Sequence, residues 1–474
     1  MITNLTIKEI QDRLKEKKFT ATQLTDFLIA KIEKEDSAIN SFVYKSFDLA
    51  KEQAKKIDEM IDAGKELPPL AGIPCGIKDN ILVDGLNCSA GSNILKDYVA
   101  SYDATVIKKL KEQGAIILGK LNLDEFAMGS SGEYSAFGPT KNPKDLERVP
   151  GGSSSGPAAA VAAGFCQFSL GSDTGGSIRQ PASFCGLVGL KPTYGAVSRS
   201  GLISLASSLD QIGPITKNID DAQIVYQAIM GKDALDSTSV DKSCLQDFDI
   251  KKIKIGIPKE YFVSGIDPEV EKTIKATIEK IKESGADVVE INLPYSKYAL
   301  ACYQILLPAE ASANLARYDN IRYGNRELHS GDFSESLEEI YRYARQKGFG
   351  PEVRRRIMLG TYSLSAGYYD AYYLRAQKVR TLIQNEFRQA FKYVDFIVTP
   401  TCPTLPFKLG ERKDDPVTMY LSDLFTTPAN IAGVCALSLP CKREQGLPIG
   451  LQIIGNFFQE DKLFKIAKIF EQIK

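Results

Sequence analysis

Two glycine- and serine-rich loops limit what this chain can fold into more than any other feature. The first reads Pro-Gly-Gly-Ser-Ser-Ser-Gly over residues 150–156, and the second reads Gly-Ser-Asp-Thr-Gly-Gly-Ser over residues 171–177. Between them, the small residues of 158–164 predict a closely packed helix, and the apolar run 165–170 predicts a strand. This pattern predicts a framework of regular elements that holds two serines, Ser153 and Ser177.

Glycine and serine together are also typical of flexible linkers, which is the simplest interpretation of the first loop. The second loop follows an apolar, strand-like run. Glycine there permits backbone angles that other residues resist, and it lets amide groups approach a ligand. Such a loop can present a nucleophilic serine together with N–H donors for a developing oxyanion.

A nucleophilic serine needs a base, and histidine is the usual one. The chain has one histidine, His329, in a polar run without apolar periodicity, which predicts a solvated loop. Lysine is the obvious substitute. Lys78 ends the apolar run 71–78, so it is placed for partial burial, which favours a neutral amine that can accept a proton.

Lys78 and the two loops occur in the order and at the spacing of the amidase signature family of Ser-cisSer-Lys hydrolases, which the chain resembles over nearly its whole length. The resemblance implies that Ser177 is the acyl-forming nucleophile and Lys78 the base. It implies that Ser153 bridges the two and follows a cis peptide bond after Gly152. It also implies an oxyanion hole formed by the amides of Thr174, Gly175, Gly176 and Ser177.

Composition argues against several other classes of protein. The chain carries 59 basic and 59 acidic residues, so no basic excess predicts autonomous nucleic-acid binding. No apolar run reaches the roughly 18 residues of a membrane span, and the N-terminus lacks a signal-peptide pattern. The nine cysteines include no Cys-x-x-Cys pair, which favours free thiols in a reducing cytosol and argues against a zinc site.

Local signals place individual elements. The first 65 or so residues are expected to be helical, and strands are expected over 72–77, 115–119, 253–257, 288–291 and 396–398. Helix starts are marked by capping-box spacing at Thr6/Glu9 and Thr20/Gln23, by Asp103, and by Asp267-Pro268.

Alternation of strands and helices predicts an α/β fold. The resemblance implies the amidase signature fold, a large mixed, twisted β-sheet flanked by helices on both faces. We expect one domain over residues 1–474. It comprises an N-terminal helical region (1–66), a catalytic core segment (67–215) and a remainder that completes the sheet and the substrate pocket (216–474).

Three further segments, 123–131, 356–373 and 415–428, resemble the family members that hydrolyse glutamine within tRNA-dependent amidotransferases. Free glutamine carries an ammonium and a carboxylate, so a selective pocket needs an anion and a cation. Arg356 and Asp423 match the family's glutamine-recognition positions, and arginine can hold a carboxylate through two parallel hydrogen bonds. The resemblance also assigns Met128, Gly129, Ser130 and Tyr303 to the pocket.

This resemblance implies glutamine hydrolysis by one member of a cytoplasmic heterotrimer with B and C subunits. The ammonia would serve conversion of Glu-tRNA(Gln) to Gln-tRNA(Gln). No P-loop occurs in the chain, so ATP and Mg are expected on a partner subunit, which would also make most of the contacts to tRNA, and no cofactor is expected here. Two alternatives stay open: a stand-alone amidase for small amides, and a catalytically dead scaffold subunit.

Overall fold

The computed structural model describes residues 2–241, 253–262, 265–325, 336–441, 443 and 445–472. Within them, one mixed sheet of 11 strands runs in the order β1-β3-β2-β4-β6-β5-β10-β11-β9-β7-β8. The strands are β1 (Phe42–Lys45), β2 (Pro74–Lys78), β3 (Ile116–Leu121), β4 (Phe168–Asp173), β5 (Val188–Lys191), β6 (Gln211–Thr216), β7 (Lys254–Pro258), β8 (Asp287–Ile291), β9 (Phe396–Pro400), β10 (Ala436–Pro440) and β11 (Gly450–Gly455).

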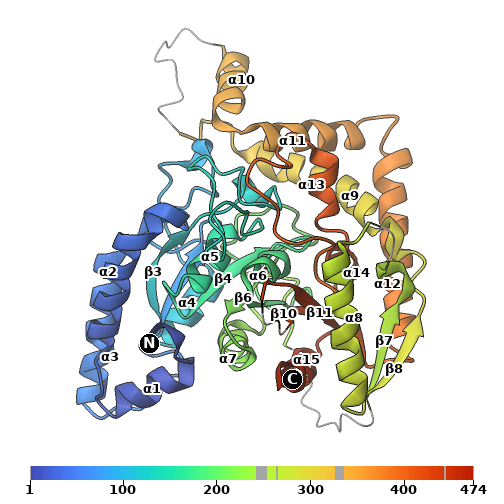
Figure 1. The fold of residues 1–474 in the computed structure, drawn as a ribbon. Coiled ribbons are helices and arrows are strands. Elements are labelled where there is room, and N and C mark those ends of the chain that lie inside the picture. Colours follow the sequence, from blue (N-terminus) through green and yellow to red (C-terminus); the bar gives the residue numbers. More distant parts are fainter. Residues whose placement is uncertain are drawn as a thin grey trace.

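Helices surround this sheet (Figure 1). The α-helices are α1 (Ile7–Lys15), α2 (Ala21–Ile39), α3 (Phe47–Asp62), α4 (Thr105–Glu112), α5 (Ser155–Ala162), α6 (Arg179–Cys185), α7 (Ile219–Ile229), α8 (Pro268–Glu283), α9 (Ala299–Asn314), α10 (Leu337–Gly348), α11 (Pro351–Leu364), α12 (Arg375–Ala390), α13 (Pro416–Leu421), α14 (Thr427–Ala432) and α15 (Glu460–Gln472). None of the helices in the described ranges is long and apolar enough to cross a membrane.

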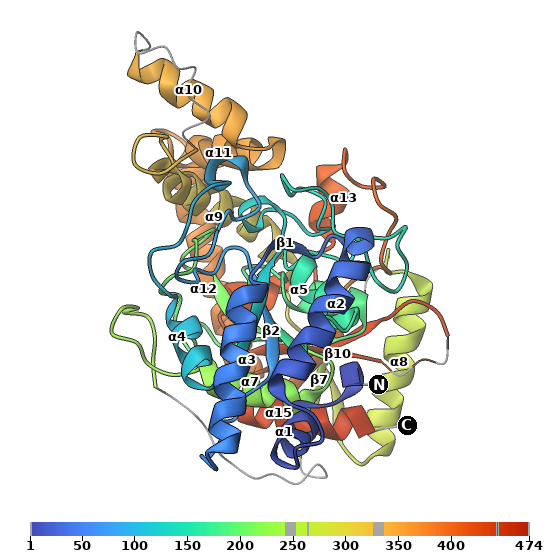
Figure 2. The same ribbon diagram turned by 90° about the vertical axis from the view of Figure 1, so that its left-hand side faces the viewer.

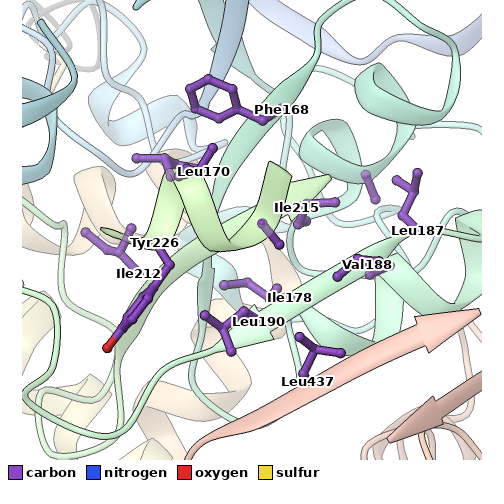
Figure 3. Close-up of a cluster of buried hydrophobic side chains, with 14 of the residues drawn as sticks. Phe168, Leu170, Ile178, Leu187, Val188, Leu190, Ile212, Ile215, Tyr226 and Leu437 are labelled. Atoms are coloured by element: carbon purple, nitrogen blue, oxygen red, sulfur yellow. The ribbon is translucent and has the colours of Figure 1, made fainter. Parts of the chain in front are cut away.

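The central strands leave room for a helix on one face and carry bulky side chains on the other. A Cβ atom on Gly189 of β5 would lie 2.7 Å from the Cβ of Ala182 on α6, so glycine allows this helix to approach closely. Because successive side chains of a strand alternate in direction, Val188 and Leu190 face the opposite side. There they join Tyr226 of α7 in a buried cluster (Figure 3). The predicted α/β fold with helices on both faces is confirmed.

The N-terminal region begins as its capping signals predict. Thr6 and Thr20 each form a complete capping box, at the starts of α1 and α2. Helices α2 and α3 lie side by side along one edge of the molecule (Figures 1 and 2). The expectation that this region is wholly helical is wrong, because residues 42–45 form β1, which pairs antiparallel with β3. This pairing partner lies more than 70 positions away, so no local signal revealed it.

Asp103 does not cap the following helix, contrary to the sequence prediction. Helix α4 begins after Ala104, which makes no side-chain cap. The Asp103 carboxylate instead accepts hydrogen bonds from the backbone N–H of Asp84 and the Nζ of Lys111, both at 2.8 Å. At the other predicted start, Asp267 does cap α8, accepting from the N–H of Glu269 at 2.8 Å.

The predicted strands are present with shifted ends. The five runs placed by their apolar pattern correspond to β2, β3, β7, β8 and β9, and the run 165–170 corresponds to β4, which begins at Phe168. The helix expected over 158–164 begins earlier, at Ser155. Strands from all three predicted segments join the one sheet, while the single-domain organisation over 1–474 stays a prediction.

Candidate active site

Lys78 and Ser172 stand at the same edge of the sheet, since β2 and β4 are parallel neighbours and both end there. The Lys78 side chain is fully buried. Its Nζ lies 2.8 Å from the Oγ of Ser153, 2.9 Å from the Oγ of Ser154 and 2.9 Å from the Oγ of Ser172. The structure therefore brings together Lys78 and the first serine loop, which lies immediately before α5.

The hydrogen bonds among these groups assign donors and acceptors. Ser154 Oγ donates to the carbonyl oxygen of Ser172 at 3.1 Å, and Asn80 Nδ2 donates to Ser172 Oγ at 3.0 Å. The hydroxyl oxygens of Ser154 and Ser172 are thus placed to accept from Lys78. A neutral amine has two hydrogens and one lone pair. If both hydrogens are donated to these oxygens, the lone pair can accept from the Ser153 hydroxyl, whose Oγ lies 2.8 Å away.

Burial makes the neutral form of Lys78 accessible near pH 7. Burial lowers the pKa of Lys78 to about 7, although the negative charges of Asp124, Asp173 and Asp210 act in the opposite direction. A solvated lysine amine has a pKa of about 10.4 and would be almost wholly protonated at neutral pH. The buried position thus gives Lys78 the proton affinity that a general base requires.

Ser177 lies in the second loop, between β4 and α6, and is 7% exposed. Its carbonyl oxygen accepts a hydrogen bond of 3.1 Å from the N–H of Ser154, which joins the two serine loops through their backbones. The Gly152–Ser153 peptide bond is cis. Lys78 and Ser153 are joined by a direct side-chain hydrogen bond, whereas Ser177 meets the first loop through main-chain atoms.

Asp124 lies against Gly152 of the first serine loop. Its carboxylate accepts from the backbone N–H groups of Gly132 and Tyr134 at 3.0 Å. A Cβ atom on Gly152 would lie 2.1 Å from Asp124 Oδ2, and one on Gly129 would lie 2.4 Å from Asp124 Cγ, so both positions require glycine. Burial raises the pKa of Asp124 to about 6, against the lowering effect of the two backbone donors.

A buried ion pair fixes the second loop. Asp173 and Arg179 are both fully buried, and Arg179 Nη2 lies 3.0 Å from Asp173 Oδ1. Asp173 also accepts from the N–H groups of Gly176 at 2.9 Å and Ile178 at 3.1 Å and from Asn430 Nδ2 at 2.8 Å. Burial alone would raise the pKa of Asp173, but the guanidinium and these donors lower it to about 2.

This arrangement distinguishes among the four amides expected in the oxyanion hole. The N–H of Gly176 is already donated to Asp173, so it can serve an oxyanion only as a shared donor. The Gly175 carbonyl is turned away, because its oxygen accepts from Thr426 Oγ1 at 2.7 Å. The other three amides of the expected set, those of Thr174, Gly175 and Ser177, do not donate to Asp173 and are the candidates for the oxyanion hole.

Arg356 lies on α11 with its guanidinium oriented by two neighbours. Its Nε donates to Glu352 Oε1, one helical turn earlier, at 2.7 Å, and its plane lies 5.0 Å from the ring centroid of Tyr420. Tyr420 in turn donates to the same Glu352 oxygen at 2.8 Å. The terminal nitrogens of Arg356 make no hydrogen bond to any residue in the described ranges. They could therefore form paired bonds with a carboxylate.

Asp423 stands near this cation with one oxygen held and one free. Its Oδ2 accepts from Ser130 Oγ at 2.6 Å, while Oδ1 is buried and has no hydrogen-bond partner among the described residues. Burial raises the pKa of Asp423 to about 7, and the hydrogen bond from Ser130 and the charge of Arg356 counteract it in part. An unpartnered buried carboxylate oxygen is a position where a ligand cation is expected.

Tyr303 lies against the second serine loop. A Cβ atom on Gly175 would lie 2.5 Å from the Tyr303 ring, so the ring covers the backbone at this position. The Arg356 and Asp423 charges act on the Tyr303 hydroxyl in opposite directions, which places all three groups near one another. Met128 and Ser130 are both buried.

Sequence reasoning missed the groups that orient these residues. Glu352 could have been found as the acid one turn before Arg356, and Asp173 and Arg179 as opposite charges inside the second motif. Asp124 gave only the signal of an acid in a glycine-containing segment, and Thr426 gave none. Their contacts join positions up to 273 apart, which no local pattern records.

Other sequence predictions concern metals, thiols and the histidine. No group of three or more His, Cys, Asp or Glu side chains suited to a metal ion occurs in the part of the chain that the structure describes. The eight cysteines in that part are free thiols, seven of them buried. His329 and Cys244 lie outside the described residues.

Known proteins share this architecture over the whole chain. The model of the family described as Amidase matches residues 23–464. The A subunit of glutamyl-tRNA(Gln) amidotransferase from Moorella thermoacetica is 53% identical over 99% of this chain and 96% of its own length. The protein of the same name from Koribacter versatilis is 52% identical over 99% of this chain and 98% of its length.

Solved structures agree. The crystal structure of the glutamyl-tRNA(Gln) amidotransferase A subunit from Thermotoga maritima superimposes with a TM-score of 0.82 at 41% identity, covering 100% of this chain and 95% of that one. Native peptide amidase from Stenotrophomonas maltophilia gives a TM-score of 0.81 at 28% identity, covering 99% and 96%. With a family match over most of its length and relatives at about half identity, this chain belongs to the amidase family.

Proposed function

We propose that the chain is the glutamine-hydrolysing A subunit of a glutamyl-tRNA(Gln) amidotransferase. The curated relatives that support this assignment carry that name and match over nearly their full length, at 51–53% identity. The observation that carries the proposal is that Arg356 and Asp423, two buried opposite charges, lie within electrostatic reach of each other. A cation with free terminal nitrogens and an anion with a free oxygen suit the carboxylate and ammonium of free glutamine.

The proposed chemistry begins at Ser177, whose Oγ attacks the side-chain carbonyl carbon of glutamine. Ser153 takes the Ser177 proton and passes its own to the lone pair of neutral Lys78, to which it is hydrogen-bonded at 2.8 Å. The oxyanion is stabilised by the amides of Thr174, Gly175 and Ser177, with Gly176 as a shared donor.

Release of ammonia reverses the proton path. Protonated Lys78 returns its proton through Ser153 to the departing nitrogen, and the C–N bond breaks to leave a glutamyl ester on Ser177. A water molecule, deprotonated by the same relay, then attacks the ester carbonyl carbon. The ester C–O bond breaks, the relay returns the proton from Lys78 through Ser153 to Ser177 Oγ, and glutamate is released.

The partner assignments form part of the proposal. In it, the ammonia reaches a separate B subunit, where ATP and Mg support amidation of tRNA-bound glutamate, and a small C subunit completes a cytoplasmic heterotrimer. This chain needs no cofactor of its own for the serine chemistry. The subunit designation in the names of the relatives supports an assembly with partners.

A stand-alone amidase is the second candidate, favoured by the likeness to peptide amidase at 28% identity. Such an enzyme acting on neutral amides would have no use for a buried arginine and a buried aspartate with free polar atoms beside the serine loop. A dead scaffold is disfavoured, because Lys78 keeps a hydrogen-bonded serine and a lowered pKa.

The proposal is tested by co-purifying the chain with candidate B and C subunits and measuring glutamine hydrolysis with and without them. We expect glutamate release that depends on Ser177, and formation of Gln-tRNA(Gln) that requires ATP and the partners. Hydrolysis of simple neutral amides at rates above those for glutamine would instead support the stand-alone amidase.

A further inference from the structure

Glu125 is a buried carboxyl group that the proposed chemistry does not use. It is 3% exposed and follows Asp124, the residue that supports the first serine loop. Its Oε2 accepts from the backbone N–H of Gly350 at 2.8 Å, and its Oε1 lies 2.5 Å from Ser92 Oγ. These two adjacent acids bond to different segments: Asp124 to the backbone N–H groups of Gly132 and Tyr134, and Glu125 to that of Gly350 before α11.

The segment that Glu125 holds is the junction between α10 and α11. Helix α10, which projects from the body of the molecule (Figures 1 and 2), ends at Gly348, and Gly350 is the residue before α11. Between them, the ring of Phe349 packs on that of Phe126 with centroids 5.7 Å apart. A Cβ atom on Gly350 would lie 2.4 Å from Glu125 Oε2, so the backbone approaches the carboxyl closely.

Because Arg356 lies on α11, its position depends on where Gly350 holds the start of that helix. An α-helix rises about 1.5 Å per residue, so Arg356 lies about 9 Å from Gly350 along a continuous helix axis. Ser130, five residues after Glu125, donates to Asp423 at 2.6 Å. The short segment 125–130 thus contacts Asp423 through Ser130 and the start of α11, which carries Arg356, through Glu125. Asp423 and Arg356 are the two groups proposed to recognise glutamine.

The backbone of this segment is held in an unusual conformation. Phe126 and Ala127 have φ values of 49° and 60°, so two consecutive residues with side chains adopt the left-handed region. The N–H of Phe126 donates to the carbonyl of Ala90 at 2.7 Å, and its ring also packs on Tyr318 at 5.2 Å. Such conformations persist where the surroundings determine them, and they cluster at functional sites.

Donors and acceptors around Glu125 match in number when its carboxyl group carries a proton. Ser92 Oγ lies within reach of both Glu125 Oε1 and the Gly348 carbonyl at 3.1 Å, but one hydroxyl has only one hydrogen. A protonated Glu125 donates to Ser92, which then donates to Gly348. Burial raises the pKa of Glu125 to about 7, while Ser92, Gly350 and the nearby charge of Arg354 act against this rise.

We propose that Glu125 is a positioning residue that fixes α11, and with it Arg356, relative to Asp423. The inference rests on the proposed function, because it concerns how the enzyme holds glutamine. Glutamine at position 125 should replace the protonated acid, since its amide nitrogen can donate to Ser92 and its oxygen can accept from Gly350. Methionine at this position has a similar size and neither hydrogen bond.

The experiment compares Glu125→Met with Glu125→Gln in the complete complex, using the exposed Glu112→Gln on α4 as the control. We expect Glu125→Met to raise the KM for glutamine about tenfold or more, with a smaller change in kcat, because ground-state binding is what is lost. Glu125→Gln and the control should stay within about twofold of the parent, which is less than about a third of the 1.4 kcal/mol that a tenfold change represents.

Labelling of Ser177 by phenylmethylsulfonyl fluoride, measured by mass spectrometry, reports on the serine site without using Arg356 or Asp423. In Glu125→Met this labelling should continue at near the parent rate. An unchanged KM in Glu125→Met, an equal loss of labelling, or a Glu125→Gln variant as impaired as Glu125→Met would each overturn the inference. Failure of the parent complex to hydrolyse glutamine would instead contradict the proposed function.

Discussion

Glu352 accepts a hydrogen bond of 2.7 Å from the Nε of Arg356, one turn later on α11. Both side chains are buried, at 4% and 5% exposure, so the pair is shielded from solvent. The bond leaves the two terminal nitrogens of the guanidinium directed elsewhere, in the paired geometry that a carboxylate prefers. Glu352 therefore orients Arg356, the cation proposed to recognise glutamine, and Tyr420 orients Glu352.

Removing the recognition charges should affect binding more than chemistry. We expect Arg356→Ala and Asp423→Ala each to raise the KM for glutamine about 10- to 100-fold, since a hydrogen bond to a charged group contributes about 1.5–3 kcal/mol. Steady-state kinetics of glutamate release would measure this. An unchanged KM in both variants would remove the main support for glutamine recognition and favour the stand-alone amidase.

Glu352→Gln should have a smaller effect of the same kind. The amide keeps the shape of the side chain but weakens the hold on Arg356, so we expect a rise in KM of about threefold to tenfold with kcat little changed. Tyr420→Phe is the matched control, because it removes one donor to Glu352 and leaves the Arg356 bond in place. Equal effects of the two variants would contradict the orienting role of the Glu352–Arg356 bond.

The pH dependence should show two groups titrating together. Lys78 must be neutral to act as base and Asp423 must be ionised to bind ammonium, and burial places both pKa values at about 7. Both requirements are met by losing a proton, so kcat/KM should rise with pH through 7 and fall below it with a logarithmic slope that approaches about two. In Asp423→Asn the slope should fall to about one.

Local patterns predicted the parts of this site that are contiguous in sequence. Lys78 is the last residue of a buried strand, and the two serine loops carry their glycines and serines within a few positions, so both features could be predicted from local sequence. Capping boxes at Thr6 and Thr20 were equally local. What could not be predicted depends on contacts between distant segments, such as the hydrogen bond from Thr426 to Gly175.

The same limit applies to the sheet. Apolar runs located six of the eleven strands, and β5, β6, β10 and β11 were not predicted. Strand β1 was also missed, because it is four residues long and is stabilised by pairing with β3, which its own sequence does not record. The Asp103 carboxylate accepts from Lys111 and from the backbone N–H of Asp84, so it does not cap α4. Tertiary partners thus decide the outcome wherever a side chain has more than one local use.

Breaking the Asp173–Arg179 pair should destabilise the whole protein. Both residues are fully buried, so Asp173→Asn leaves an uncompensated guanidinium, at a cost of about 3–5 kcal/mol. Glu52→Gln, which removes an exposed partner of Lys56, should cost less than about 1 kcal/mol. Thermal unfolding of both variants, monitored by circular dichroism, would compare them, and similar melting temperatures would contradict the structural role of the buried pair.

The stability that the Asp173–Arg179 pair contributes should be lost in acid. The folded-state pKa of Asp173 is lowered to about 2, below the value of about 3.9 expected in the unfolded chain. Its contribution is therefore fully present above about pH 4 and is lost as the pH falls towards 2. The difference in stability between the parent and Asp173→Asn should narrow over this window, and a difference that does not change with pH would contradict the assignment.

The last prediction concerns Lys78 itself. Lys78→Arg keeps a cation but cannot lose its proton at working pH, and Lys78→Ala removes the base while leaving Ser177 and the backbone donors in place. In the reconstituted complex, both variants should lose glutamine hydrolysis by about 10²-fold or more, as expected for removal of a general base. Both should still amidate Glu-tRNA(Gln) when ammonium chloride replaces glutamine, because free ammonia bypasses this site. Paired assays with the two nitrogen sources separate loss of chemistry from loss of assembly. Glutamine hydrolysis by Lys78→Arg at near the parent rate would show that Lys78 is not the base, whatever its distance from Ser153.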